Sequence, residues 1–142
     1  MLRNGHWSFP VQVSPDNCVG FVYMIVDTFM KEYYIGKKFT AGHGKINNGV
    51  ESNWRTYISS SKYVQTMINN RPKEEFEFII LETYKTKSGL AFGEVWSIVT
   101  TKGPLKKNCG NRLVPKIGFN VKEDITERHI LRMEHALSLI GE

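Results

Sequence analysis

The sequence predicts an α+β domain: a small, mainly antiparallel, three-stranded sheet flanked by helices, with an additional C-terminal helix. Three apolar runs rich in β-branched and aromatic residues have the length of strands, and the first two are close enough to form a hairpin. Three other stretches place their apolar residues at helical spacing. With 142 residues, 41% of them hydrophobic, the chain has the size and composition of one globular domain.

The first two strands are predicted over residues 18–26 and 32–38. In the first, Phe21, Tyr23 and Ile25 alternate with further apolar residues, which is typical of a buried strand. The second contains two tyrosines and an isoleucine before a glycine. Only a short turn separates the two runs, so they predict an antiparallel hairpin.

A glycine-rich loop and a helix follow the hairpin. Residues 40–49 contain three glycines and two asparagines, which indicates a flexible loop. A helix is predicted from the serines at 59–61, one of which would cap it, to the Arg71-Pro72 pair that would end it. Its apolar stripe consists of Tyr63, Val64, Met67 and Ile68.

The remaining elements are a third strand and two helices. Residues 75–84 form a run that is too continuously apolar for an exposed edge. The helix predicted over 87–101 gathers on one wide arc Ala91, Phe92, Val95, Trp96, Ile98 and Val99. After a basic, irregular stretch, a last helix is predicted from about 124 to 140 with the apolar residues Ile130, Leu131, Ala136, Leu137 and Ile140. His129 and His135 are predicted to lie on the surface of this helix.

The positive charge is concentrated in the middle of the chain. Residues 37–116 carry 14 basic and 6 acidic side chains, a net +8, against −1 for residues 1–36 and −2 for residues 117–142. Such a distribution is expected of a protein that binds a phosphate backbone, and it is also compatible with a merely solvated basic surface.

No membrane span or leader peptide is recognisable, so we expect no membrane association and a cytoplasmic location. Cys18 and Cys109 have no partner at metal-ligand or redox spacing, which fits a reducing compartment.

The predicted hairpin carries two aromatic tripeptides, Phe21-Val22-Tyr23 and Tyr34-Ile35-Gly36. Downstream follow, in order, Lys37 and Lys38, the segment Trp54-Arg55-Thr56-Tyr57, a run of serines, a hydrophobic strand, a helix with Glu94, and an asparagine in a basic loop. This ordered set resembles the GIY-YIG nuclease family, and within it the free-standing, homing-like endonucleases often encoded by phages. The resemblance covers roughly residues 18–120. It divides the chain into an N-terminal extension (1–17), the nuclease-like domain (18–120) and a C-terminal helix (121–142) packed on or extending the domain.

The chain departs from the family pattern in two places. The first tripeptide reads Phe-Val-Tyr instead of Gly-Ile-Tyr, which keeps the tyrosine and the apolar character of the strand. The family's arginine usually follows the second motif at a distance that falls on Gly44 here. Arg55 takes its place if the glycine-rich loop is an insertion.

The resemblance implies a DNA endonuclease that hydrolyses phosphodiester bonds through a tyrosine-assisted site with one Mg²⁺ or Mn²⁺ ion. It implies Glu94 as the metal ligand and Tyr23 as the base. The implied catalytic set is Tyr23, Tyr34, Lys37, Arg55, Tyr57, Glu94 and Asn111, with Asn108 as the alternative to Asn111. A catalytically idle DNA-binding or protein-interaction module with the same fold is the alternative function.

The residues agree with this chemistry in their own right. A phenol with a pKa near ~10 is a poor base unless cations stabilise the phenolate, and Lys37 and Arg55 are candidates for that role. On a helical wheel Glu94 lies between Leu90 and Ile98, so we expect a partly desolvated carboxylate with a partner. The partner is either a lysine in an ordinary salt bridge or a Mg²⁺ ion completed by waters and a substrate phosphate.

Double-stranded DNA is the expected partner, and the sequence leaves a homodimer open. Predicted phosphate contacts, which would position DNA without reading its sequence, are Lys38, Lys45, Lys62, Lys102, Lys106, Lys107, Arg112 and Lys116. His43 lies in the glycine-rich loop, where a passive role and a role in the site are both open.

Overall fold

The computed structural model describes residues 3–42, 50–101 and 125–141 of the chain. Its sheet has the strand order β2-β1-β3, and both pairings are antiparallel. The strands are β1 (Gly20–Asp27), β2 (Glu32–Phe39) and β3 (Phe76–Tyr84). With three α-helices around the sheet, the predicted α+β class is confirmed.

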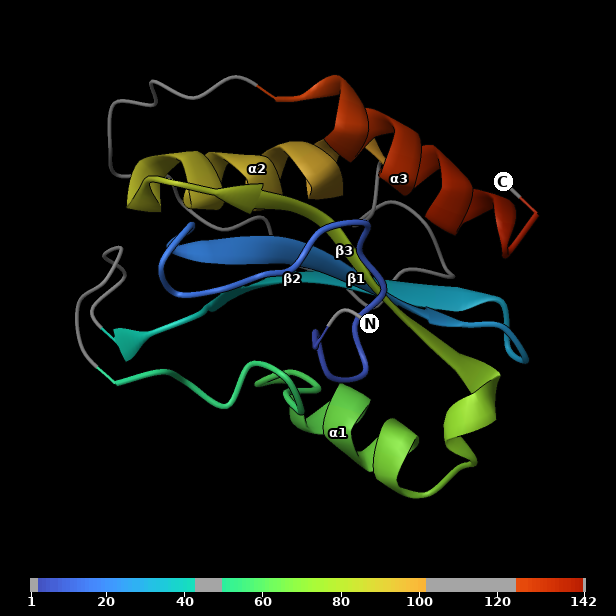
Figure 1. The fold of residues 1–142 in the computed structure, drawn as a ribbon. Coiled ribbons are helices and arrows are strands. Elements are labelled where there is room, and N and C mark those ends of the chain that lie inside the picture. The colour runs from blue at the N-terminus through green and yellow to red at the C-terminus, as the bar shows by residue number, and fades with distance from the viewer. Residues whose placement is uncertain (1–2, 43–49, 102–124, 142) are drawn as a thin grey trace.

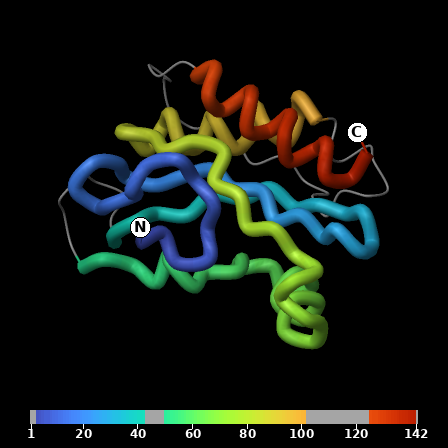
Figure 2. Tube along the Cα trace, turned by 45° about the vertical axis from the view of Figure 1, so that its right-hand side comes forward, coloured from blue at the N-terminus to red at the C-terminus, as the bar shows by residue number. Residues whose placement is uncertain are grey.

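The helices lie in layers on the two faces of the sheet (Figure 1). Helices α2 (Lys87–Thr100) and α3 (Glu127–Ser138) cover one face, which we call the α2 face. Helix α1 (Lys62–Asn69) lies on the other, the α1 face, and the second view shows the same separation (Figure 2). The short 3-10 turn Lys73–Glu75, which the sequence did not predict, leads from α1 into β3.

The central strand contributes to two separate cores because successive side chains point to opposite faces. Val22 and Met24 of β1 belong to the core under α2 and α3, together with Leu81 and Leu90. Phe21, Tyr23 and Ile25 belong to the core on the α1 face, which is rich in aromatic residues and includes Trp7, Trp54 and Phe78.

The buried face of α2 differs from the predicted apolar arc. Leu90, Ala91 and Ile98 are buried, but so are Gly93, Glu94 and Ser97, whereas Val99 is exposed. Phe92, Val95 and Trp96 of the predicted arc are only half-buried. The buried face of α2 is rotated toward Gly93 and Ser97 because these small residues allow close packing. Tyr84 lies so near Gly93 that a Cβ there would be 2.8 Å from the tyrosine ring.

His129 of α3 is fully buried, so the prediction that it lies on the surface was wrong, whereas His135 is exposed as predicted. The Nδ1 atom of His129 lies 2.9 Å from the Tyr84 hydroxyl, and its Nε2 lies 2.7 Å from Ser97 Oγ. Ser97 Oγ donates to the Gly93 carbonyl at 2.7 Å, so Nε2 is the protonated nitrogen and Nδ1 accepts from Tyr84. This chain of hydrogen bonds joins α3, β3 and α2.

The apolar stripe predicted for α3 was wrong at one further position. Leu131 is exposed, while Met133, Ala136 and Ile140 are buried. On α1, Ser61 caps the helix as the serine run predicted, and Val64 and Ile68 are buried. Tyr63, predicted in the stripe, is exposed instead.

The N-terminal segment packs on the sheet instead of extending away from it. Trp7, Phe9 and Val13 are buried in the core of the α1 face, and Ser8 forms a bridge to Ile79 at the outer edge of β3.

The domain boundaries at residues 17 and 120 stay predictions. In the described part of the chain, no helix has the length and apolar character needed to cross a bilayer.

Candidate active site

The two tripeptides meet across the hairpin. Tyr23 on β1 is paired with Gly36 on β2, and the tyrosine ring lies against the glycine. A Cβ on residue 36 would lie 2.3 Å from the Tyr23 hydroxyl oxygen, a distance that no side chain tolerates. Gly36 is therefore required because it leaves room for the phenol of the first motif.

The Tyr23 phenol is buried, with 2% of its surface exposed. Burial raises its pKa well above the ordinary value, and the neighbouring Tyr57, Tyr34 and Glu94 add to this rise, while a hydrogen bond with the Ser59 side chain opposes it. In the ligand-free protein Tyr23 is therefore a neutral hydroxyl at physiological pH.

Ser59 is a site residue that the sequence analysis did not single out. Its φ is 137°, a value that L-residues rarely adopt, and its side chain is buried. The surrounding structure holds it there: its Oγ accepts from Ser61 N at 3.0 Å, and its carbonyl accepts from Gln65 Nε2 at 2.6 Å. Backbone strain beside the central phenol leaves no signal in the sequence, where Ser59 is one of three consecutive serines.

Lys37 and Glu94 form an ion pair on the α2 face. Lys37 follows Gly36 directly, and strand alternation turns its side chain toward α2. Its Nζ lies 3.3 Å from Glu94 Oε1. Glu94 itself is 9% exposed and lies between the buried Leu90 and Ile98, as the helical wheel predicted.

Burial raises the pKa of Glu94 above its ordinary value even though Lys37 lowers it. One lysine is thus too little compensation for the desolvation of this carboxylate. A carboxylate oxygen with spare acceptor capacity is what Mg²⁺ or Mn²⁺ needs, so the residue fits the implied ion. The described residues contain no cluster of three or more acidic, histidine or cysteine side chains for a metal. Water and substrate oxygens are the further ligands that Mg²⁺ commonly takes beside a single carboxylate.

Tyr34, Tyr57 and Lys38 lie on the same side of the sheet as Tyr23. Tyr34 and Tyr57 are half-buried against the core of the α1 face, and the rings of Tyr57 and Tyr23 meet edge to face at 6.1 Å. Lys38 Nζ lies 4.3 Å from the centre of the Tyr57 ring, and burial lowers the pKa of this lysine. Lys62, a predicted DNA contact, is exposed at the first position of α1.

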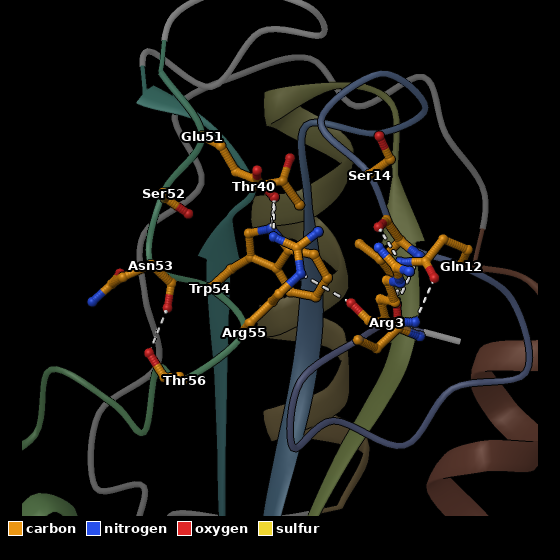
Figure 3. A network of polar contacts seen from close by, with 12 residues as sticks. Arg3, Gln12, Ser14, Thr40, Glu51, Ser52, Asn53, Trp54, Arg55 and Thr56 are labelled. Atoms are coloured by element: carbon orange, nitrogen blue, oxygen red, sulfur yellow. Dashed lines mark hydrogen bonds and ion pairs between the residues drawn. The ribbon is translucent and has the colours of Figure 1, made fainter. Parts of the chain in front are cut away.

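Arg55 makes its contacts elsewhere in the structure (Figure 3). It forms an ion pair with Glu51, donates from Nε to the Arg3 carbonyl at 2.9 Å, and lies over the ring of Trp54. Among the described residues, none of its hydrogen bonds or ion pairs is with Tyr23. The structure thus joins Lys37 to Glu94 but does not bring Arg55 onto the phenol.

The glycine-rich loop is closed at its base. Ala41 and Glu51 form an antiparallel bridge, and Gly42 N donates to the Val50 carbonyl at 3.1 Å. The chain therefore leaves and re-enters the fold at nearly one point, which agrees with the interpretation of the loop as an insertion ahead of Arg55. The predicted site residues that lie outside the described residues are His43, Lys45, Lys102, Lys106, Lys107, Asn108, Asn111, Arg112 and Lys116.

Comparison with protein families gives a match over residues 6–111 to the family described as "Putative endonuclease segE, GIY-YIG domain". The match includes both tripeptides, Arg55 and Glu94, and it begins inside the N-terminal segment that packs on the sheet. Comparisons with curated proteins and with solved structures gave no match. The matched range covers most of the chain and coincides with the three-stranded antiparallel sheet and the helix that carries Glu94, so the chain belongs to the SegE-type family of GIY-YIG endonuclease domains.

Proposed function

We propose that the protein is a DNA endonuclease that hydrolyses phosphodiester bonds at a site formed by Tyr23, Lys37 and Glu94, with one Mg²⁺ or Mn²⁺ ion. The observation that carries the proposal is Glu94, a buried carboxylate with a raised pKa whose ionic partner within residues 3–42, 50–101 and 125–141 is Lys37. It also raises the pKa of Tyr23. A purely structural carboxylate would be compensated more fully. Membership of the family supports nuclease activity, and DNA as the substrate follows from it.

Glu94 is the residue that would hold the ion, with waters and phosphate oxygens as further ligands. When bound, such an ion supplies positive charge to the phosphoryl oxygens and to the leaving oxygen. It would also compete with Lys37 for the carboxylate, since both cations seek the same oxygens. The Lys37 ammonium would then be available to a phosphate oxygen.

Tyr23 is the candidate base, and its environment sets a condition on that role. Because its pKa is raised in the free protein, the phenol has to lose its proton in the presence of additional positive charge. Lys38 lies on the same side of the sheet as Tyr23, with its Nζ 4.3 Å from the centre of the neighbouring Tyr57 ring. The Ser59 hydroxyl can donate to a phenolate. We propose that these two groups stabilise the phenolate when DNA is bound.

Binding of duplex DNA would involve the basic side chains that the sequence analysis assigns to phosphate contacts. Lys38 and Lys62 are the described members of this set, and the proposed contacts at 45, 102, 106, 107, 112 and 116 lie outside the described residues. A catalytically idle binding module is the second candidate, favoured by the contacts that hold Arg55 away from Tyr23. Nothing in the described residues supports a homodimer.

The test is incubation with supercoiled plasmid in Mg²⁺, in Mn²⁺ and in EDTA. We expect conversion to nicked or linear plasmid with either ion and none in EDTA. Glu94→Gln and Tyr23→Phe should each reduce it below detection in this assay, while Glu127→Gln, which removes an exposed carboxylate from the first turn of α3, should cleave normally. Duplex binding without cleavage by the unchanged protein would identify an idle module.

A further inference from the structure

Glu51, Trp54 and Arg55 contact one another at the base of the glycine-rich loop, with Glu51 and Arg55 partly exposed and Trp54 buried (Figure 3). Arg55 Nη1 is ion-paired with Glu51 Oε1, and the Trp54 indole Nε1 donates to the same oxygen at 2.8 Å. The side chains of Glu51 and Arg55 are each 40% exposed. Two donors thus converge on one oxygen of a partly exposed carboxylate.

Both donors are held in place by contacts that do not involve Glu51. Arg55 Nε donates to the Arg3 carbonyl, and the guanidinium lies 4.4 Å from the centre of the Trp54 ring. Trp54 is fully buried, and its carbonyl accepts from Trp7 Nε1 at 2.6 Å. Removal of the Glu51 carboxylate should therefore leave the indole and the guanidinium oriented toward the same point.

The point where they converge stabilises an anion. The hydrogen bond from Trp54 and the charge and hydrogen bond of Arg55 hold the pKa of Glu51 below its ordinary value. A phosphate oxygen has the same requirements as a carboxylate oxygen, and arginine binds both well. An exposed ion pair changes an equilibrium by only about two- to fivefold, so a polyanion can displace this carboxylate.

We propose that Trp54 and Arg55 form a binding site for one phosphate oxygen of the DNA backbone, which Glu51 occupies until DNA displaces its carboxylate. The inference rests on the proposed function in taking DNA as the ligand. It accounts for an arginine of the matched family range being engaged by a carboxylate of its own chain. Glu51 is then an internal competitor that weakens binding to DNA.

The first experiment measures the affinity for a short duplex in EDTA, where no cleavage occurs. Glu51→Ala should bind the duplex about two- to fivefold more tightly than the unchanged protein, and Arg55→Ala should bind it more weakly. Glu134→Ala, which removes an exposed carboxylate from α3, is the control for a general gain in positive charge. Glu51→Gln, which loses the charge but can still accept from Trp54, should show the same direction of change.

The second experiment uses inorganic phosphate as the probe and the indole N–H signals of Trp7, Trp54 and Trp96 in NMR spectra. In Glu51→Ala, phosphate should shift the Trp54 signal and leave the other two in place. The proposal is overturned if Glu51→Ala binds duplex no tighter than Glu134→Ala, or if phosphate leaves the Trp54 signal unchanged. Neither result affects the plasmid assay, and a protein that fails to cut plasmid can still show the Trp54 response.

Discussion

Glu94 and Asp27 are both buried carboxylates, yet their surroundings move their pKa values in opposite directions. Asp27, at the tip of the hairpin, accepts hydrogen bonds from Arg71 at 2.5 and 2.8 Å and from the backbone N–H groups of Phe29 and Met30. Burial alone would raise the pKa of Asp27, but these bonds outweigh it and the pKa lies below its ordinary value. For Glu94, at the other end of the hairpin, burial outweighs Lys37 and the pKa is raised.

Glu82 supports the same distinction, because it is as buried as Asp27 and its pKa is also lowered. Its oxygens accept from Arg128 at 2.7 and 3.0 Å, from Thr126 at 2.5 Å and from its own neighbour Thr83 N at 2.8 Å. Asp27 and Glu82 are thus structural carboxylates whose acceptor capacity is used by the fold. Among the described residues, Glu94 has Lys37 as its ionic partner and its pKa stays raised, which is the state expected of a carboxylate that can still bind a metal ion.

The largest effect is expected from Glu94→Gln. Loss of the proposed ligand should reduce plasmid cleavage by roughly 10³-fold, which corresponds to about 4 kcal/mol of transition-state stabilisation. Because the pKa of Glu94 is raised in the fold, its ionisation makes the protein less stable as pH rises through the window above 4.5. The free energy of unfolding of the variant at pH 7 should therefore rise by roughly 0.5–2 kcal/mol.

Cleavage kinetics and urea unfolding at pH 7 test the two halves of this prediction separately. A variant that loses both activity and stability would place Glu94 among the structural carboxylates, beside Asp27.

Asp27→Asn and Glu82→Gln should lower the stability of the fold and leave cleavage unchanged, the opposite of what is expected for Glu94→Gln. Each removes the charge from a buried carboxylate that accepts several hydrogen bonds, although Arg71 keeps Glu75 as an ionic partner and Arg128 is partly exposed. The loss of charge-assisted hydrogen bonds typically costs about 1.5–3 kcal/mol of stability. Cleavage per folded molecule should be unchanged at a temperature where the variant is still folded. Urea unfolding combined with an active-site titration measures this, and a loss of activity without loss of stability would contradict the comparison.

The sequence predicted the burial of Glu94 correctly because its neighbours at i−4 and i+4, Leu90 and Ile98, are both apolar. It did not identify Lys37 as the partner, since that contact joins elements almost sixty residues apart. It assigned Arg55 to the phenol from its charge and from family order, whereas the structure pairs Arg55 with Glu51. It missed the packing of Trp7 because the N-terminal segment shows no periodicity. These contacts depend on tertiary geometry, which local patterns do not contain.

His129 extends the comparison to a buried base with both ring nitrogens hydrogen-bonded. Burial lowers its pKa to about 4. Since the unfolded chain takes up the proton first, this residue stabilises the fold fully above about pH 6.5 and progressively less as pH falls toward 4. At pH 5 the loss amounts to roughly 2 kcal/mol.

His129→Gln, which cannot titrate, should remove that part of the pH dependence. The measurement is the free energy of unfolding of both proteins between pH 5 and pH 7.5. His135→Gln, on the exposed side of the same helix, is the matched control and should leave the curve of the unchanged protein intact. Parallel curves for His129→Gln and the unchanged protein would mean that folding does not lower the pKa of His129.

The smallest effect is expected from variants of Ser59. They test whether strained backbone, like the raised pKa of Glu94, is a destabilising feature of the candidate site. Ser59 combines a φ of 137° with a hydrogen bond to Tyr23. Ser59→Gly removes the hydroxyl and relieves the strain, whereas Ser59→Ala removes the hydroxyl and keeps the strain. The glycine variant should be more stable than the alanine variant by about 1 kcal/mol in urea unfolding.

If Tyr23 acts as a phenolate, both variants should shift the rising limb of the pH–rate profile to higher pH, because the hydrogen bond from Ser59 that lowers the phenol pKa is gone. An unshifted limb in both variants would assign Ser59 to backbone geometry alone and would move the base away from Tyr23.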